Sequence, residues 1–266
     1  MNGNRSSNVG RVALITGASD GIGRELARCF ARDRHELVLV ARNEGKLKGV
    51  AAEIASAYGI RVSHIVQDLS APDGARNLLD EVRNRGIVVD FLVNNAGVGT
   101  YGLFSEADIE RDLRMMQLNM TSLTVLTKRL LPEMLKRRRG GILNIASTAA
   151  FQPGPLMAVY YATKAYVLSF SEALANELNG SGVTVSVVCP GPTWSGFQRT
   201  AGMDASRLFH RGVMNASDVA DIAYRGFMNG KTTIIPGVRN KLLALSVRFG
   251  PRKLVPMIVR AMQAPT

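Results

Sequence analysis

Ser147, Tyr160 and Lys164 have the side chains and the spacing that hydride transfer at a carbonyl requires. Tyr160 and Lys164 are four residues apart in a helical pattern, so we expect both on one helix face. A phenol has a pKa near ~10, and a nearby ammonium favours the phenolate and lowers that pKa. Ser147 follows an apolar run, and its hydroxyl is placed to hydrogen-bond a substrate oxygen that develops charge. The set predicts a site that moves a proton at a carbonyl or alcohol.

A glycine-rich turn lies between the first apolar run of the chain and the first helical pattern. Gly17, Gly21 and Gly23 allow a tight turn and let a pyrophosphate approach the backbone. The N-terminus of the helix then offers unpaired N–H groups to that anion. The spacing is Gly-x-x-x-Gly-x-Gly and not the usual Gly-x-Gly-x-x-Gly. An ordinary strand-to-helix turn is the alternative, and the order of strand, glycines and helix favours a dinucleotide site.

The end of the second apolar run predicts which dinucleotide binds. Many dinucleotide folds carry an acidic residue there, which binds the ribose 2′-hydroxyl. This chain has Ala41 followed by Arg42, and a guanidinium binds phosphate as a forked, permanently charged donor. We therefore predict NADP(H) in preference to NAD(H). The alternative is that Arg42 is a solvated loop cation, and Asp20 in the glycine turn does not favour a phosphate.

Together these motifs resemble the classical short-chain dehydrogenase/reductase family from about residue 11 to residue 235. The matching segments are Thr16 to Gly23, Asp68 with Leu69, Asn94 to Gly97, Asn119, Ser147, Tyr160-x-x-x-Lys164, and Pro190 with Gly191. Each segment is weak evidence alone, and their order along the chain makes a chance match implausible. Beyond residue 235 the resemblance is loose.

The resemblance implies roles for individual residues. Tyr160 would donate the proton in reduction, and Lys164 would lower its pKa and hold the nicotinamide ribose. Ser147 would polarise the carbonyl, and Asn119 would hold a water in a proton relay. The implied cofactor contacts are Gly17, Ser19, Asp20, Gly21, Ile22, Gly23, Arg42, Asp68, Leu69, Asn95, Ala96, Gly97, Tyr160, Lys164, Pro190, Gly191 and Thr193. The structural alternatives are a strand-ending Ser147, a turn residue at Asp68, and an Asn119 inside one long helix over residues 109–135.

The fold class that the sequence predicts is α/β. At 266 residues and 46% hydrophobic content, the chain can bury one large core. Strand-like and helix-like runs alternate without a linker, which predicts a doubly wound, Rossmann-like parallel sheet of about seven strands flanked by helices in a single domain. Residues 1–10 are expected to be a disordered tail, and residues 11–237 the catalytic domain with a substrate lid at about 195–214. Residues 238–266 form a basic amphipathic C-terminal extension.

The net charge of +12 invites an anionic partner. The run from Lys136 to Arg139 ends a helical pattern, where cations complement the helix dipole. The C-terminal extension interleaves apolar and basic side chains, which suits a membrane surface or a hydrophobic partner. A helix packed on its own domain is the alternative. The apolar set is Leu242, Leu243, Leu245, Val247, Leu254, Val255, Ile258 and Val259, and the basic set is Arg239, Lys241, Arg248, Arg252, Lys253 and Arg260.

Other features limit the partners and the compartment. His35, His64 and His210 show no ligand spacing, so no metal is expected. The basic residues are dispersed and no recognition-helix motif is present, so nucleic acid is not expected. The N-terminus lacks the apolar core of a signal peptide, and no apolar run approaches the ~20 residues of a membrane span. Both cysteines read as reduced hydrophobes. A cytoplasmic protein is the expectation.

The predicted function is that of an NADP(H)-dependent carbonyl reductase or alcohol dehydrogenase. An apolar lid segment that includes Trp194 and Phe197 favours an apolar substrate, and the resemblance suggests 3-oxoacyl, steroid-like or general carbonyl compounds. The family also implies a homodimer or homotetramer that pairs through the helical runs 105–135 and 158–179. The alternative function is a catalytically silent dinucleotide-binding sensor or interaction protein with the same fold.

Overall fold

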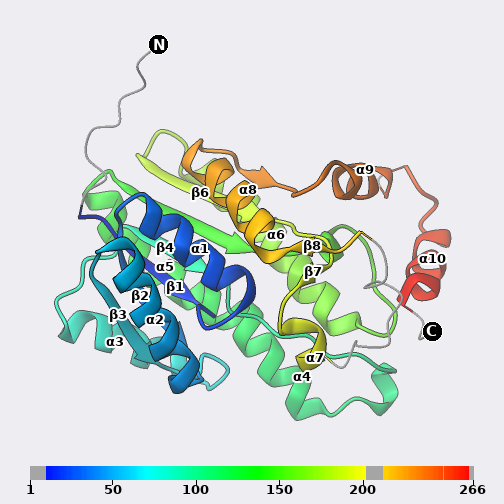
Figure 1. Cartoon of the computed structure of the whole chain (residues 1–266). Coiled ribbons are helices and arrows are strands. Elements are labelled where there is room, and N and C mark those ends of the chain that lie inside the picture. The colour runs from blue at the N-terminus through cyan, green and yellow to red at the C-terminus, as the bar shows by residue number, and fades with distance from the viewer. Residues whose placement is uncertain (1–9, 202–211, 248, 264–266) are drawn as a thin grey trace.

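The computed structural model describes residues 10–201, 212–247 and 249–263. Its main feature is a parallel sheet of seven strands in the order β3-β2-β1-β4-β5-β6-β9 (Figure 1). The strands are β1 (Val12–Thr16), β2 (Glu36–Ala41), β3 (Val62–Val66), β4 (Phe91–Asn94), β5 (Gly140–Ile145), β6 (Val183–Val188) and β9 (Thr233–Ile234). The strand order reverses between β1 and β4, which is where such sheets bind ligands. The predicted doubly wound fold with seven strands is confirmed.

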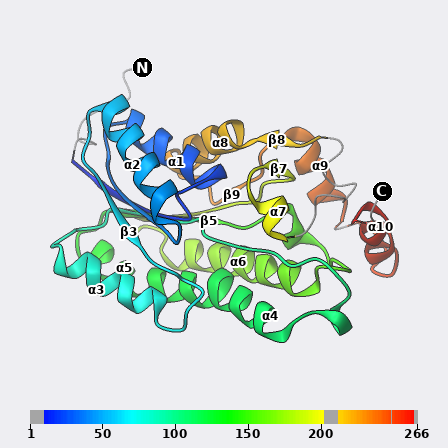
Figure 2. The same cartoon turned by 60° about the horizontal axis from the view of Figure 1, so that its bottom comes forward.

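Helices cover both faces of the sheet (Figure 2). One face carries α1 (Gly21–Arg32), α2 (Glu44–Tyr58) and α8 (Ala216–Met228), and the other carries α3 (Gly74–Asn84), α5 (Leu123–Lys136) and α6 (Ala158–Glu177). Alternate side chains of β1 enter the two cores: Ala13 and Ile15 pack with the first set of helices, and Leu14 packs with the second. Burial on both faces explains why the strands read as continuous apolar runs.

The segment expected as one helix over residues 109–135 is interrupted. It consists of α4 (Ile109–Met116), a π-helical segment (Gln117–Ser122) and α5. A π-helical segment fits extra residues into a turn and rotates the side chains that follow, and such segments often mark functional sites. Short 3₁₀ turns precede α4 (Phe104–Glu106) and follow β5 (Thr148–Phe151). The single long helix, which was the structural alternative for Asn119, is therefore not formed, and the break lies at the segment that contains this residue.

The remaining elements lie beyond the carboxyl ends of the strands. A small parallel pair, β7 (Thr193–Trp194) and β8 (Met214–Asn215), flanks α7 (Phe197–Ala201). The C-terminal helices α9 (Val238–Ser246) and α10 (Leu254–Gln263) lie at one end of the molecule (Figures 1 and 2). No helix among the described residues is long and apolar enough to span a bilayer.

Two predictions fall partly outside the described residues. The expected disordered tail includes residues 1–9, and the expected lid includes residues 202–211, so their structure is not described. The oligomer helices are described, and several of their apolar residues are buried in the core of the subunit and cannot form an interface. Those residues are Leu126, Val167, Leu168 and Leu174. Ile109, Leu113 and Met116 on α4 are exposed at helical spacing and remain available.

Candidate active site

A cavity of about 1310 Å³ lies at the carboxyl ends of the strands. Most of the residues that the sequence predicted for the site line it. They are Gly17, Ser19, Asp20, Gly21, Ile22, Arg42, Asn95, Ala96, Gly97, Ser147, Tyr160, Lys164, Pro190, Gly191 and Thr193. The lining does not include Gly23, Asp68, Leu69 and Asn119. The predicted site is therefore one continuous space that runs from the glycine turn to α6.

The glycine turn is shaped by contacts that leave no room for side chains. Gly17 and Gly21 have φ angles of +66° and +54°, which glycine adopts without strain. A Cβ on Gly17 would lie 2.8 Å from Nδ2 of Asn95. A Cβ on Gly23 would collide with the carbonyl oxygen of Gly17. Asn95 fastens the turn to β4, because its Nδ2 donates to the carbonyl oxygen of Thr16 at 2.9 Å. Gly23 therefore packs against the backbone of the turn and does not line the cavity.

Asp20 sits at the N-terminus of α1 as its capping residue. The Asp20 carboxylate accepts a hydrogen bond of 2.7 Å from the backbone N–H of Gly21. A carboxylate at this position stabilises the helix through its dipole. The same negative charge faces the cavity, where it repels any phosphate that approaches the turn. Asp20 therefore strengthens the helix and weakens the site for anions.

Two cations, Arg42 and Lys46, line the cavity together with the glycine turn. Arg42 follows β2, and Lys46 is in the first turn of α2. Asn43 caps α2 by accepting a hydrogen bond of 2.9 Å from the backbone N–H of Lys46. Both cations are exposed, and neither pairs with an acidic group within 4.0 Å among the described residues. Lys46 was not among the predicted site residues, although a cation in the first turn of the helix after Arg42 could have indicated it.

Asp68 and Leu69 support the cavity without lining it. The Asp68 carboxylate accepts hydrogen bonds from the backbone N–H and the hydroxyl of Ser70, at 2.9 and 2.6 Å. Partial burial opposes ionisation of Asp68, but the bonds from Ser70 and the nearby Arg42 and Arg114 outweigh it and lower the pKa. Leu69 is buried in the core. The predicted adenine contact of Asp68 stays a prediction.

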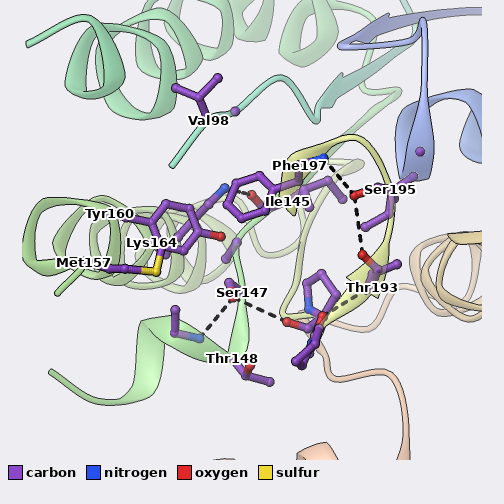
Figure 3. A pocket seen from close by; sticks show the side chains of 18 of the residues that line it. Val98, Ile145, Ser147, Thr148, Met157, Tyr160, Lys164, Thr193, Ser195 and Phe197 are labelled. Carbon is purple, nitrogen blue, oxygen red and sulfur yellow. Dashed lines mark hydrogen bonds between the residues drawn. The ribbon is translucent and has the colours of Figure 1, made fainter. Parts of the chain in front are cut away.

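Tyr160 and Lys164 project from α6 towards the end of β5, where Ser147 lies (Figure 3). The Lys164 Nζ donates to the carbonyl oxygen of Ile145 at 2.9 Å and lies 5.8 Å from the centroid of the Tyr160 ring. The Ser147 hydroxyl accepts from the backbone N–H of Ala149 at 3.1 Å. The structure therefore brings Ser147, Tyr160 and Lys164 together at one place.

The protonation states at this site follow from burial. Burial raises the pKa of Tyr160, and a hydrogen bond with Ser147 only partly offsets this effect. Burial also lowers the pKa of Lys164 to about 8. We expected Lys164 to lower the pKa of Tyr160, but its ammonium is directed to the Ile145 carbonyl and the loss of hydration dominates. In the protein alone, Tyr160 is a neutral phenol at pH 7.

Asn119 lies behind the site, in the π-helical segment. Its Oδ1 accepts from the backbone N–H of Val98 at 3.1 Å, and its Nδ2 donates to the Val98 carbonyl oxygen at 2.9 Å. The same Nδ2 donates to the Thr163 hydroxyl at 3.0 Å. The buried side chain therefore ties the loop after β4 to α6, next to Lys164. The role of Asn119 in holding a relay water stays a prediction.

Apolar side chains surround the Tyr160 end of the cavity. Phe197 packs against Tyr160 with ring centroids 5.3 Å apart, and Val98, Ala149 and Met157 also line this end (Figure 3). The part of the expected lid over residues 202–211 lies outside the described residues.

One wall of the cavity was not predicted from the sequence. Residues of α9 and α10 line it, whereas the sequence predicted only a basic amphipathic C-terminal extension and gave it no part in the site. The lining residues from this extension are Arg239, Asn240, Leu243, Ala244, Ile258, Val259, Ala261, Met262 and Gln263. The end of α10 is fixed by two hydrogen bonds: the Tyr101 hydroxyl donates to the Gln263 carbonyl at 2.8 Å, and the Gln263 amide donates to the Tyr161 hydroxyl.

Comparison with known proteins places this site in a family. A family model for the short chain dehydrogenases matches residues 11–205. The chain is 35% identical over 188 residues to the very-long-chain 3-oxoacyl-CoA reductase of Anas platyrhynchos, an alignment that covers 68% of this chain and 59% of the relative. The chain spans between 54% and 59% of the length of this relative and of two other curated relatives.

Solved structures extend the similarity to nearly the whole chain. A short-chain dehydrogenase from Sphingobium yanoikuyae in complex with NADPH is 34% identical, with a TM-score of 0.81 over 96% of this chain and 98% of that chain. A short chain dehydrogenase/reductase from Burkholderia phymatum in complex with NAD is 26% identical, with a TM-score of 0.79 over 97% of each chain. Because these two structures hold different dinucleotides, the choice of cofactor depends on residues particular to this chain.

Proposed function

The chain belongs to the short chain dehydrogenase family, and we propose that it is an NADP(H)-dependent oxidoreductase that interconverts an apolar ketone or aldehyde and the corresponding alcohol. One observation carries the proposal. A single cavity joins a glycine turn, two cations and the N-terminus of α1 to Ser147, Tyr160 and Lys164. A dinucleotide needs the first set of groups, and a carbonyl needs the second.

The residues of the glycine turn fit a dinucleotide. Gly17 and Gly21 bring bare backbone to the cavity beside the N-terminus of α1, which attracts a pyrophosphate. Gly97 lies between this turn and α6, where a Cβ would be 3.4 Å from Nζ of Lys164 and 3.3 Å from Oδ1 of Asn119. Bare backbone at Gly97 lets a ribose approach Lys164. A bound, reduced nicotinamide would supply the hydride that reaches the carbonyl carbon of the substrate.

Tyr160 supplies the proton in the proposed reduction. Its hydroxyl is protonated at neutral pH because burial raises its pKa, so it can give a proton to the carbonyl oxygen as negative charge develops there. Ser147 can hydrogen-bond the same oxygen and fix its position. The Lys164 ammonium stabilises the resulting phenolate, and a proton from solvent then restores the phenol. Oxidation of an alcohol runs through the same groups in reverse.

Arg42 and Lys46 support the preference for NADP(H). Both cations line the cavity at the N-terminus of α2, and the helix dipole adds to their positive potential. The ribose 2′-phosphate of NADP(H) is a dianion that matches this potential, whereas the 2′-hydroxyl of NAD(H) gains little from it. The residues that line the cavity next to Arg42 in sequence include no acidic side chain. None of them therefore offers a carboxylate to the ribose 2′-hydroxyl of NAD(H).

The substrate is proposed to be apolar. Phe197, Met157 and the α10 wall surround the place next to the Tyr160 hydroxyl. The 3-oxoacyl relative supports a long-chain 3-oxoacyl compound as one candidate, and a steroid-like or other bulky ketone has the same apolar character. Arg239 lines the cavity on the α9 side, where it can meet an anionic group at the end of such a substrate.

The cofactor preference is tested first, and turnover of carbonyl substrates is tested second. Fluorescence titration of the purified protein should give tight binding of NADPH and weaker binding of NADH. Arg42→Asp should weaken NADPH binding by at least ~10-fold and leave NADH binding within a few fold. An equal effect on both dinucleotides would remove Arg42 from its role.

Turnover is then measured with ketones of increasing apolar length and saturating NADPH. The proposal requires kcat/KM to rise with apolar length, because each buried methylene adds ~0.8 kcal/mol of binding energy. A flat series would refute the apolar substrate. Binding of NADPH with no turnover on any carbonyl or alcohol would favour the silent sensor.

A further inference from the structure

The outer sides of α9 and α10 carry large apolar side chains in contact with solvent. We call the exposed residues between 238 and 262 the C-terminal face. Nine of the 19 exposed large hydrophobic side chains in the described part of the chain belong to it. They are Val238, Leu242, Leu243, Leu245, Phe249, Leu254, Met257, Ile258 and Met262. Phe249 is 82% exposed and Met257 is 67% exposed. A single-domain protein rarely leaves so many neighbouring apolar side chains in water without a partner.

This exposure is not the result of helices that lack contact with the domain. Val259 and Gln263 of α10 are buried, and Gln263 is held by Tyr101 and Tyr161. On α9, Asn240 and Ala244 are buried, and the Asn240 amide donates to the Pro236 carbonyl at 2.7 Å. Each helix therefore has one side packed on the domain. The two helices thus pack on their own domain, as in the alternative that the sequence left open, while their other apolar side chains stay exposed to solvent.

The charge of the C-terminal face is uniformly positive. Residues 238–266 contain six cations and no acidic residue, so they contribute half of the net charge of +12. The cations of the described part are Arg239, Lys241, Arg252, Lys253 and Arg260, and all five are exposed. Exposed apolar side chains flanked by cations are the pattern of helices that lie in the interface of an anionic bilayer.

The C-terminal face also borders the cavity. Leu243, Ile258 and Met262 are exposed to solvent, and the same three residues line the cavity. Apolar surface therefore continues from the outside of the molecule to the space next to Tyr160.

We propose that the C-terminal face binds an anionic membrane surface, with the mouth of the cavity at the lipid. Charge decides between lipid and a second copy of this chain. In a two-fold contact the same face meets itself, so the cations of one copy would approach those of the other. An anionic headgroup layer instead neutralises them, and the adjacent acyl region accepts Leu254, Met257 and their neighbours. The proposal does not depend on the reaction that the cavity performs.

Vesicle sedimentation tests the proposal without any measurement of turnover. The protein should bind phosphatidylcholine vesicles that contain phosphatidylserine, and not vesicles of phosphatidylcholine alone. Arg252→Gln with Lys253→Gln should reduce the partition coefficient by about tenfold or more, because each surface cation contributes to binding. Leu254→Ser with Met257→Ser should reduce it similarly through lost apolar insertion. Circular dichroism and thermal melting establish that each variant is folded.

Arg76→Gln with Arg83→Gln is the matched control. Both side chains are exposed on α3, which lies at the other end of the molecule from α10 (Figures 1 and 2). The pair removes the same charge and should leave vesicle binding unchanged. An equal loss in the control would show that net charge alone causes binding and would overturn the proposal. The proposal would also be overturned if the unchanged protein did not bind the vesicles. The same holds if light scattering shows an oligomer that does not bind vesicles and that Leu254→Ser with Met257→Ser dissociates.

Discussion

Replacement of Lys164 by methionine should stabilise the folded protein while it removes a group of the proposed site. Lys164 is 5% exposed, and its Nζ donates a hydrogen bond of 2.9 Å to the carbonyl oxygen of Ile145. Burial lowers the pKa of Lys164 from 10.5 to about 8. The charged form is therefore less favourable in the folded state than in the unfolded state. Methionine is similar in length and carries no charge.

The size of the effect follows from the two pKa values. A tenfold change in proton affinity equals about 1.4 kcal/mol, so at pH 7 the buried ammonium costs about 3 kcal/mol. The unfolded chain binds more protons than the folded one between pH 8 and 10.5, so this cost falls as the pH rises through that window. At pH 9.5 about 1.4 kcal/mol remains. The Ile145 carbonyl loses a donor in the variant, which offsets about 1 kcal/mol at either pH.

Guanidinium denaturation followed by circular dichroism, without added dinucleotide, measures the difference. Lys164→Met should raise the free energy of unfolding by about 2 kcal/mol at pH 7 and by less than about 1 kcal/mol at pH 9.5. Lys136→Met removes an exposed lysine at the end of α5 and should change stability by less than about 0.5 kcal/mol at both pH values. A Lys164→Met variant that is less stable than the parent at pH 7, or a gain that does not change with pH, would refute the reasoning.

Three further predictions concern the cofactor, the proton and the oligomer. Tyr160→Phe should lower kcat by about 10²- to 10⁴-fold and change NADPH affinity by less than a few fold, and retained turnover would exclude Tyr160 as the proton donor. Asp20→Asn keeps the helix cap and removes a charge, so NADPH should bind several-fold more tightly at low salt, with a smaller gain at high salt. Light scattering at micromolar concentration should return a dimer or larger, which Ile109→Ser with Leu113→Ser should weaken, and a monomeric parent protein would contradict the oligomer.

The sequence predicted the part of the site that follows from local order along the chain. The glycine turn comes directly after β1, and Arg42 comes directly after β2. Because parallel strands end at the same edge of the sheet, residues that follow neighbouring strands must meet there. Tyr160 and Lys164 are close because a helix brings residues four apart together. In each case the spacing within a short segment is sufficient to predict the contact.

Properties that depend on the whole fold could not be read from spacing. The protonation of Tyr160 is set by burial among segments far apart in sequence, so a rule about a nearby lysine gave the wrong direction for the protein alone. The α10 wall depends on a hydrogen bond between Tyr161 and Gln263, which are 102 residues apart. A basic amphipathic pattern indicates that one side of a helix is apolar, but it does not say which cavity the other side covers.

The site residues that local spacing predicted and the cavity wall that it did not predict lie in different parts of the chain. The match to the family model ends at residue 205, and it includes the glycine turn, Ser147, Tyr160 and Lys164. The wall formed by α9 and α10 begins at residue 238, beyond that match. Chemistry common to a family needs the first region, whereas the shape of the apolar space next to Tyr160 depends on the second. Exchange of α10 for that of a relative should therefore change KM among apolar ketones and leave NADPH affinity unaltered, and a loss of NADPH binding would show that the two regions are not separable.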